Sequence, residues 1–313
     1  MVRASPQLPT RRGTVALKTK ANRAVKKPQA RIGIIGGSGL YAMKGLSEAK
    51  EVRVKTPFGH PSEAIVTGLL EGKRVAFLAR HGRGHRILPT EINYRANIYA
   101  LKILGADRII SVSAVGSLKE ELAPGEFLVA DQFVDRTKHR VSTFFGAGLV
   151  AHVTFDKPTC PQVSRVLADA CIHCGVKVHS KGTYICMEGP QFSTLAEAHM
   201  HRDLGFDVIG MTNVTEAKLA REAELCYGAI AMITDYDCWH PDHESVTGAQ
   251  IIAMLNQNAE NAQRVLREAV KAMPAAHECK CGSALAHALI TDPKLVPRAT
   301  KKRLTAIIGK YIS

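Results

Sequence analysis

The sequence predicts an α/β fold, a single domain in which a central mixed β-sheet is flanked by helices on both faces. Short apolar runs typical of strands alternate with segments of helical periodicity along most of the chain. The 313 residues suffice for one large α/β domain. The hydrophobic content of 46% is ordinary for a globular protein with a sizeable core.

Residues 31–40, RIGIIGGSGL, are predicted to form a strand that runs into a glycine-rich turn. The spacing of its glycines is not the GxGxxG of dinucleotide-binding folds, and a loop rather than a helix follows. A nicotinamide-binding Rossmann domain is therefore disfavoured. The exposed backbone amides of the turn, together with the Ser38 hydroxyl, would still form a nest for a phosphate. Glycine-rich turns are common after strands, so this turn alone does not identify a site.

Further strands and helices alternate downstream of this turn. Strand-like runs cover residues 64–70, 74–78, 108–112 and 126–133. Helical patterns cover residues 92–105, 161–174, 195–202 and 250–273. The helix at 92–105 ends on Gly105, a typical C-cap signal.

Two segments at the ends of predicted strands have residues suited to binding a ligand. Residues 79–85, ARHGRGH, hold two arginines and two histidines. Arginine offers a planar fork to phosphate oxygens and histidine a further donor, so an anion site competes here with an ordinary solvated loop. Residues 111–116 end another strand in small side chains, which allow a ligand to approach the backbone.

The stretch 205–239 organises the predicted site. A short strand at 208–211 leads into a helix, for which Asn213 and Glu216 have the spacing of a capping box. A second strand at 227–233 ends in Asp235 and Asp237. These aspartates are either loop caps or acceptors for an amino-bearing ring, and one of them, protonated in a dry pocket, would act as a general acid.

The turn 187–192, MEGPQF, adds one aromatic side chain and one carboxylate. Phe192 is placed either to stack on a planar ring or in the ordinary core. Glu188 is a candidate for holding sugar hydroxyls. These alternatives stay open at the level of the residues.

The net charge of +14 is confined to the two ends of the chain. Residues 1–30 hold eight Lys or Arg and residues 293–313 hold six, with no acid in either segment. The remaining 28 basic and 28 acidic residues balance between positions 31 and 292. We therefore expect three parts: a disordered basic extension at 1–30, a neutral domain at 31–292 and a solvated basic tail at 293–313. Nucleic-acid binding through these ends is the alternative from another functional class.

The chain has eight cysteines and no stretch typical of a secretory signal, which favours a reducing, cytoplasmic setting. Cys171 and Cys174 have the spacing of half a zinc site, but no second CxxC pair follows, so buried helical thiols are the preferred interpretation. Cys279 and Cys281 form either a reversible dithiol or two ordinary thiols. We expect no metal site and no membrane span.

Taken together, the motifs resemble the purine nucleoside phosphorylase and methylthioadenosine phosphorylase family, and specifically its methylthioadenosine branch. The resemblance covers roughly residues 31–245 and rests on ordered segments. These are IGIIGGSGL, TPFG, ARHGRGH, NYRANI, SAVGSL, EGPQFST, GMTNVTEA and TDYDCW. It implies phosphorolysis of 5′-methylthioadenosine to adenine and 5-methylthioribose 1-phosphate, with phosphate as a substrate and with no cofactor. It also implies a homotrimer or homohexamer.

The resemblance assigns roles to individual positions. It implies a phosphate site formed by Ser38, Arg80, His81, Ser113, Ala114 and Thr212. It places Phe192 and Ile209 in the base pocket, Met211 under the ribose, and Asp235 and Asp237 at the base, with Asp235 donating a proton to N7. It places His85, Ile251 and, from a neighbouring subunit, His152 in the 5′-methylthio pocket. A disulfide between Cys279 and Cys281 is a further implication of the resemblance. The alternative within the family is a phosphorylase of 6-oxopurine nucleosides or methylthioinosine, against which the aspartate pair argues.

Overall fold

The computed structural model describes residues 29–37, 43–241 and 248–312. The predicted basic extension and Ser38 therefore lie outside the described residues, except for positions 29 and 30. The predicted fold class is confirmed, because one mixed sheet of 11 strands carries helices on both faces.

The strands are listed here in chain order. They are β1 (Ile32–Gly36), β2 (Ser47–Val52), β3 (Ile65–Leu70), β4 (Lys73–Ala79), β5 (Arg108–Ser117), β6 (Phe127–Ala130), β7 (Gln132–Asp135), β8 (Val178–His179), β9 (Thr183–Cys186), β10 (Val208–Gly210) and β11 (Cys226–Asp235). The strand predicted at 126–133 is two strands, because Asp131 interrupts it and donates its backbone N–H to Gly182. β6 then pairs with β11, whereas β7 pairs with β9.

The centre of the sheet is parallel. β1 pairs with β4 on one side and with β5 on the other, and β5 pairs with β11, all in parallel. The carboxyl ends of these four strands consequently meet at one edge. In an open α/β sheet this edge is where ligands bind.

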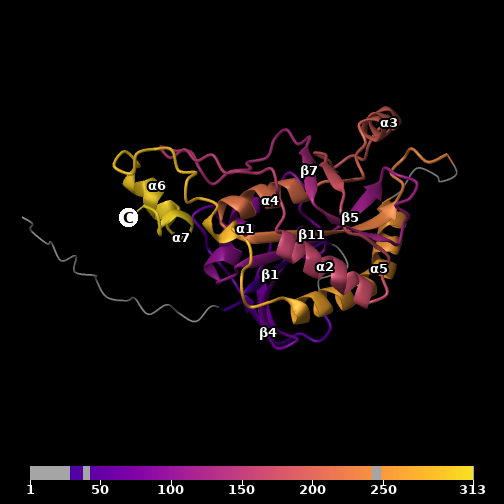
Figure 1. The fold of residues 1–313 in the computed structure, drawn as a ribbon, viewed down its shortest axis with the longest axis horizontal. Coiled ribbons are helices and arrows are strands. Elements are labelled where there is room, and N and C mark those ends of the chain that lie inside the picture. Colours follow the sequence, from indigo (N-terminus) through magenta and orange to yellow (C-terminus); the bar gives the residue numbers. More distant parts are fainter. Residues whose placement is uncertain (1–28, 38–42, 242–247, 313) are drawn as a thin grey trace, which may run out of the picture.

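The helices form two layers. They are α1 (Tyr94–Ile103), α2 (Pro161–His173), α3 (Leu195–Asp203), α4 (Asn213–Glu222), α5 (Gly248–Ala272), α6 (Arg298–Arg303) and α7 (Thr305–Ile308), with a 3-10 turn at Cys281–Ser283. Figure 1 shows α2 and α5 on one face of the sheet and α1 and α4 on the other. Each pair covers its own apolar core. Within the described ranges, we find no helix with the length and apolar composition required to cross a bilayer.

The C-terminal basic segment differs from the expectation of a solvated tail. Two short helices, α6 and α7, form there, and Leu304, Ile307, Ile308 and Ile312 are buried in the core beside α1. Their spacing is that of one apolar helical face, whereas the basic residues occupy other positions. The positive charge therefore marks the outer side of a packed element.

Candidate active site

A cavity of about 880 Å³ opens at the carboxyl edge of the sheet. Most of the residues predicted for the site line it. They are Arg80, His81, His85, Ser113, Ala114, Phe192, Ile209, Met211, Thr212, Asp235 and Asp237. Ile251 lies in α5, but its side chain is outside the described part of the structure. His152 is exposed and does not line the cavity of its own chain.

Arg80 and Glu216 form a buried ion pair at one end of this cavity. Arg80 directly follows β4, and its Nε donates to Glu216 Oε1 over 2.5 Å. The two side chains are only 1% and 2% exposed. Glu216 also accepts from the hydroxyl of Ser111 at 2.7 Å and from that of Tyr227 at 3.0 Å. The carboxylate of Glu216 raises the pKa of Arg80, against the opposing effect of burial.

The hydrogen bonds of Arg80 to the protein leave one N–H group of its guanidinium for a ligand. A guanidinium has five N–H groups. Arg80 uses Nε on Glu216, Nη1 on the carbonyl of Val112 and Nη2 on both Ser111 and Glu216. One N–H on Nη1 has no protein acceptor among the described residues. Nη1 lies near Gly37, where an added Cβ atom would be 3.5 Å away.

The capping box predicted for α4 is wrong. The N-cap is Thr212, and its side chain makes no capping hydrogen bond to the helix. Glu216, predicted to cap the helix, instead reaches Arg80. A glutamate at this position fits the spacing of a capping box, although its carboxylate in fact pairs with the buried Arg80. Thr212 lines the cavity, so the amino end of α4, which is the positive end of its dipole, lies beside the cavity.

His81 lies next to Arg80 and presents an acceptor to the cavity. Its Nδ1 is 2.8 Å from the carbonyl oxygen of Ile87, so Nδ1 carries the proton of the neutral ring. Burial and the neighbouring Arg80 charge lower the pKa of His81 to about 3. The ring stacks on His85, with centroids 4.2 Å apart. The sequence suggested a donor at this position, whereas Nε2 is an acceptor.

Asp235 ends β11 at the opposite side of the cavity. Its carboxylate accepts the hydroxyl of Thr234 at 2.6 Å and the backbone N–H of Asp237 at 2.8 Å. Gly116 makes room for it, because a Cβ there would stand 2.9 Å from Asp235 Oδ1. Of the small residues predicted at the end of β5, Gly116 thus serves the close approach of a carboxylate, while Ser113 and Ala114 line the cavity.

Both aspartates retain protons more readily than ordinary carboxylic acids. Burial raises the pKa of Asp235, and the two hydrogen bonds that it accepts only partly offset the effect. For Asp237, burial and the charge of Asp235 raise the pKa to about 6, although the hydroxyl of Ser193 lowers it. The pair can therefore hold a proton close to neutral pH.

The mouth of the cavity is apolar and open to solvent. Leu88, Phe192 and Leu195 line it, yet they are 46%, 49% and 54% exposed. Phe192 is thus neither in the core nor covered by its own chain, which excludes the core alternative left open by the sequence. Exposed apolar side chains around a cavity mark a surface for a ligand or another protein chain.

Glu188 is not placed to hold a ligand, contrary to the hypothesis from the sequence. Its carboxylate accepts from the backbone N–H of His139 at 3.1 Å, from Thr90 and from the backbone N–H of Lys138. Burial alone would raise the pKa of Glu188, but the Lys138 amide and the other donors bring it to about 2. Glu188 therefore fixes the shape of the loop and does not line the cavity.

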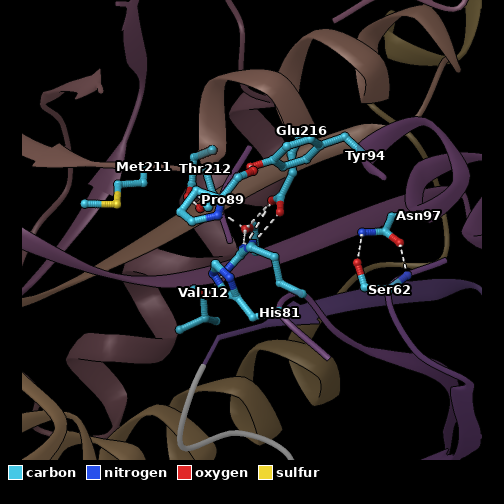
Figure 2. Close-up of polar contacts among 12 residues, drawn as sticks. Ser62, His81, Pro89, Tyr94, Asn97, Val112, Met211, Thr212 and Glu216 are labelled. Carbon is cyan, nitrogen blue, oxygen red and sulfur yellow. Dashed lines mark hydrogen bonds and ion pairs between the residues drawn. The ribbon is translucent and has the colours of Figure 1, made fainter. Parts of the chain in front are cut away.

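Arg140 is a residue that the sequence did not single out. Its guanidinium is 1% exposed and donates to the carbonyl of Met211, to that of Glu188 at 2.6 Å and to the hydroxyl of Tyr94 at 3.2 Å. Figure 2 shows the Met211 side chain pointing away from Glu216. Arg140 therefore joins the loops that carry Met211 and Phe192.

Comparisons with known proteins agree with this arrangement. A family model described as the phosphorylase superfamily matches residues 31–271. An S-methyl-5′-thioadenosine phosphorylase of Koribacter versatilis is 65% identical over 283 residues, which cover 90% of this chain and 97% of the relative. A methylthioadenosine phosphorylase from an Antarctic soil metagenomic library is 51% identical, with a TM-score of 0.85 over 90% of this chain and 99% of that one. A methylthioadenosine phosphorylase of Schistosoma mansoni, solved with adenine, is 36% identical, with a TM-score of 0.78 over 82% of this chain and 96% of that one.

Replacing Glu216 by alanine is expected to lower the free energy of unfolding by about 3–5 kcal/mol, because it leaves the buried charge of Arg80 uncompensated. Urea denaturation measures the change. The double variant Arg80→Met/Glu216→Leu should regain much of the loss, since it removes both charges. Glu260→Ala, at an exposed pair with Lys44, is the control and should cost about 0–1 kcal/mol. Equal effects of the buried and the exposed substitution would contradict the assignment.

The raised pKa of Asp237 predicts that Asp237→Asn increases the free energy of unfolding by an amount that depends on pH. Between about pH 4 and pH 6 the folded protein holds a proton on Asp237 that the unfolded chain has lost. The parent protein therefore loses stability as pH rises through this window. Asn has no such titration and tolerates the positive φ of 54°. The variant should gain up to about 3 kcal/mol over the parent across the window. Denaturation at several pH values tests this, and a difference that does not vary with pH would refute it.

Proposed function

The chain belongs to the phosphorylase superfamily and, within it, to the methylthioadenosine phosphorylases, and on this premise we propose that it catalyses the phosphorolysis of 5′-methylthioadenosine. The products are adenine and 5-methylthioribose 1-phosphate. The observation that carries the proposal is one cavity with an anion-binding end at Arg80 and Thr212 and a proton-holding end at Asp235 and Asp237. The names of the relatives support the same substrate.

The phosphate binds at the Arg80 end. The uncommitted N–H of Arg80, the first-turn amides of α4 and the hydroxyls of Ser113 and Thr212 supply donors to its oxygens. Nε2 of His81 accepts the hydrogen bond of a monoprotonated phosphate, which leaves the unprotonated oxygens free for attack. The Ala114 position contributes a small side chain, so that the anion reaches the strand end. Ser38 is the further phosphate contact that the resemblance implies.

The adenine base binds at the aspartate end, between Phe192 and Ile209. Asp237 accepts from the exocyclic amino group, and Asp235 donates its proton to N7. The bond between C1′ and N9 breaks as its electron pair passes to the purine, and a phosphate oxygen bonds to C1′. Protonation of N7 neutralises the leaving base, while the phosphate faces an oxocarbenium-like carbon. Positioning and charge account for the reaction, so it requires neither metal nor organic cofactor.

The ribose lies over Met211, and the 5′-methylthio group points to the apolar mouth. His85 lines the cavity, and Ile251 is the further contact of the methylthio group that the resemblance implies. A second copy of the chain covers the mouth and contributes His152, which is exposed in its own subunit. The exposed apolar rim at Leu88 supports this cover. A homotrimer or homohexamer is therefore part of the proposal.

The remaining assignments follow from the reaction. Its two products feed purine and methionine salvage. A cytoplasmic location is consistent with eight cysteines that are all free thiols. Nucleic acid is not a partner in this proposal, because part of the basic charge belongs to the packed segment at α6 and α7.

The proposed function predicts release of adenine from 5′-methylthioadenosine that depends strictly on phosphate. Adenosine, methylthioinosine and inosine are compared under the same conditions, and free base is measured with and without phosphate. Methylthioadenosine should react fastest, because only it offers both the amino group and an apolar 5′ end. Faster turnover of inosine or methylthioinosine would reject the substrate while keeping the reaction class. Release without phosphate would reject the reaction.

Asp237→Asn is expected to move the preference from adenine toward 6-oxopurine nucleosides. An amide can donate to a 6-oxo group, which a carboxylate cannot do. The ratio of kcat/KM for methylthioadenosine over methylthioinosine should fall by about 100-fold or more, the loss expected when a polar group in a specific site becomes mismatched. Asp131→Asn, away from the cavity, is the control. An unchanged ratio in Asp237→Asn would remove Asp237 from base recognition.

A further inference from the structure

Four of the eight cysteines gather at the edge of the sheet opposite the cavity. The sulfur atoms of Cys160, Cys226, Cys279 and Cys281 all lie within 4.8 Å of one another. Cys160 is the N-cap of α2, Cys226 is the first residue of β11, and the other two follow α5. Asp235 ends the same strand, β11, so roughly 30 Å of strand separates the cluster from the aspartate pair.

The spacing of the sulfurs fits a tetrahedral metal. Zinc–sulfur bonds of 2.3 Å place the sulfurs of a tetrahedron about 3.8 Å apart. In the cluster, Cys226 Sγ and Cys279 Sγ are 3.3 Å apart, and every pair falls within the 4.8 Å limit. No disulfide joins these four side chains in the structure. A tetrahedral set of four thiolates is typical of zinc.

The backbone around the cluster is already held in place. The N–H of Cys160 donates to the carbonyl of Tyr227 at 2.7 Å, which fixes the start of α2 beside β11. Gln162 donates to the carbonyl of Ala276 at 3.2 Å and accepts the N–H of Glu278 at 3.3 Å. The ligand-bearing segment therefore does not need to fold around an ion.

A hydrogen-bonding partner also stands beside the sulfurs. His277 Nδ1 is 3.5 Å from Cys226 Sγ, and its Nε2 is 3.4 Å from Asp107 Oδ2. A histidine held by a carboxylate and directed at a thiolate is the kind of outer-shell contact that orients metal ligands. The cluster thus has both the ligands and a supporting contact.

We propose that Cys160, Cys226, Cys279 and Cys281 form a structural zinc site. All four coordination positions come from the protein, which leaves none for water or substrate. Binding of Zn²⁺ to the four sulfurs releases their thiol protons to solvent and involves no change of oxidation state. The ion would fasten the segment after α5 to α2 and β11. This role is independent of the phosphorolysis proposed above.

The test uses the full-length chain purified in reductant and loaded with a zinc salt, then freed of excess metal. Elemental analysis should find one zinc per chain, and chelation should increase the number of thiols that react with a thiol reagent in the folded protein. Cys279→Ser should lose the bound zinc and unfold at a lower temperature. Cys174→Ser, at another half-buried cysteine outside the cluster, is the matched control and should retain zinc.

A second measurement covers the case in which Cys279→Ser does not fold. The parent protein, stripped by a chelator in reductant, should take up Co²⁺ and show the visible absorption of a tetrahedral cobalt–thiolate centre, which zinc then displaces. Chelation should lower the unfolding temperature and leave the initial rate of base release unchanged. Three outcomes after incubation with zinc would overturn the proposal. The protein retains no metal, it binds iron in preference to zinc, or its four cysteines form disulfides in place of a metal site.

Discussion

The buried pair of Arg80 and Glu216 is the interaction on which the site depends. It joins the end of β4 to the first turns of α4, and through Ser111 and Tyr227 it also reaches β5 and β11. A buried ion pair adds little net stability, because desolvation offsets most of the attraction between its charges. Its value here is geometric. Glu216 and the strand ends occupy all but one N–H of the guanidinium, and that one faces the glycine turn. The pair thus holds the Arg80 cation in a fixed orientation, and its burial limits the screening of that charge by water.

The two ends of the cavity differ in charge. One end carries a buried cation, and the other carries two carboxyl groups whose pKa is raised by burial. At one end, Glu216 stabilises the charge of Arg80, and the neutral His81 leaves the site's positive character to the guanidinium and the helix dipole. At the other end, burial raises the pKa of both aspartates, so the pair can hold a proton. A substrate between them has its anionic nucleophile next to donors and its leaving group next to an acid. Arg140 fixes the backbone of Met211, which belongs to the cavity wall.

Much of the lining of this cavity could be predicted from the sequence, because several of its residues lie at the end of a strand or at the start of a helix. Arg80 and Asp235 come directly after apolar runs, and parallel strands bring their carboxyl ends together. The sequence failed where a partner is distant along the chain. Glu216 has the spacing of a capping residue, and nothing local reveals that Arg80, 136 positions away, takes its carboxylate. Arg140 lies in an irregular stretch without periodicity. In the C-terminal segment, the excess of basic residues obscured an apolar helical face at Leu304 and Ile308.

The cysteine cluster could not be predicted from the sequence for the same reason. Its members are spread between positions 160 and 281, and only the fold brings them together. Its position explains why a fastening is needed there. Cys281 is buried in the core beneath α2 and α5, whereas Leu285, four residues later, is buried in the core beneath α1 and α4. The chain therefore passes from one face of the sheet to the other across its amino edge. It does so with only a single 3-10 turn of regular structure in that stretch. Backbone groups in such a crossing lack the ladders that hold strands. A site whose ligands come from α2, β11 and the crossing itself would fix the passage at the point where the two cores meet.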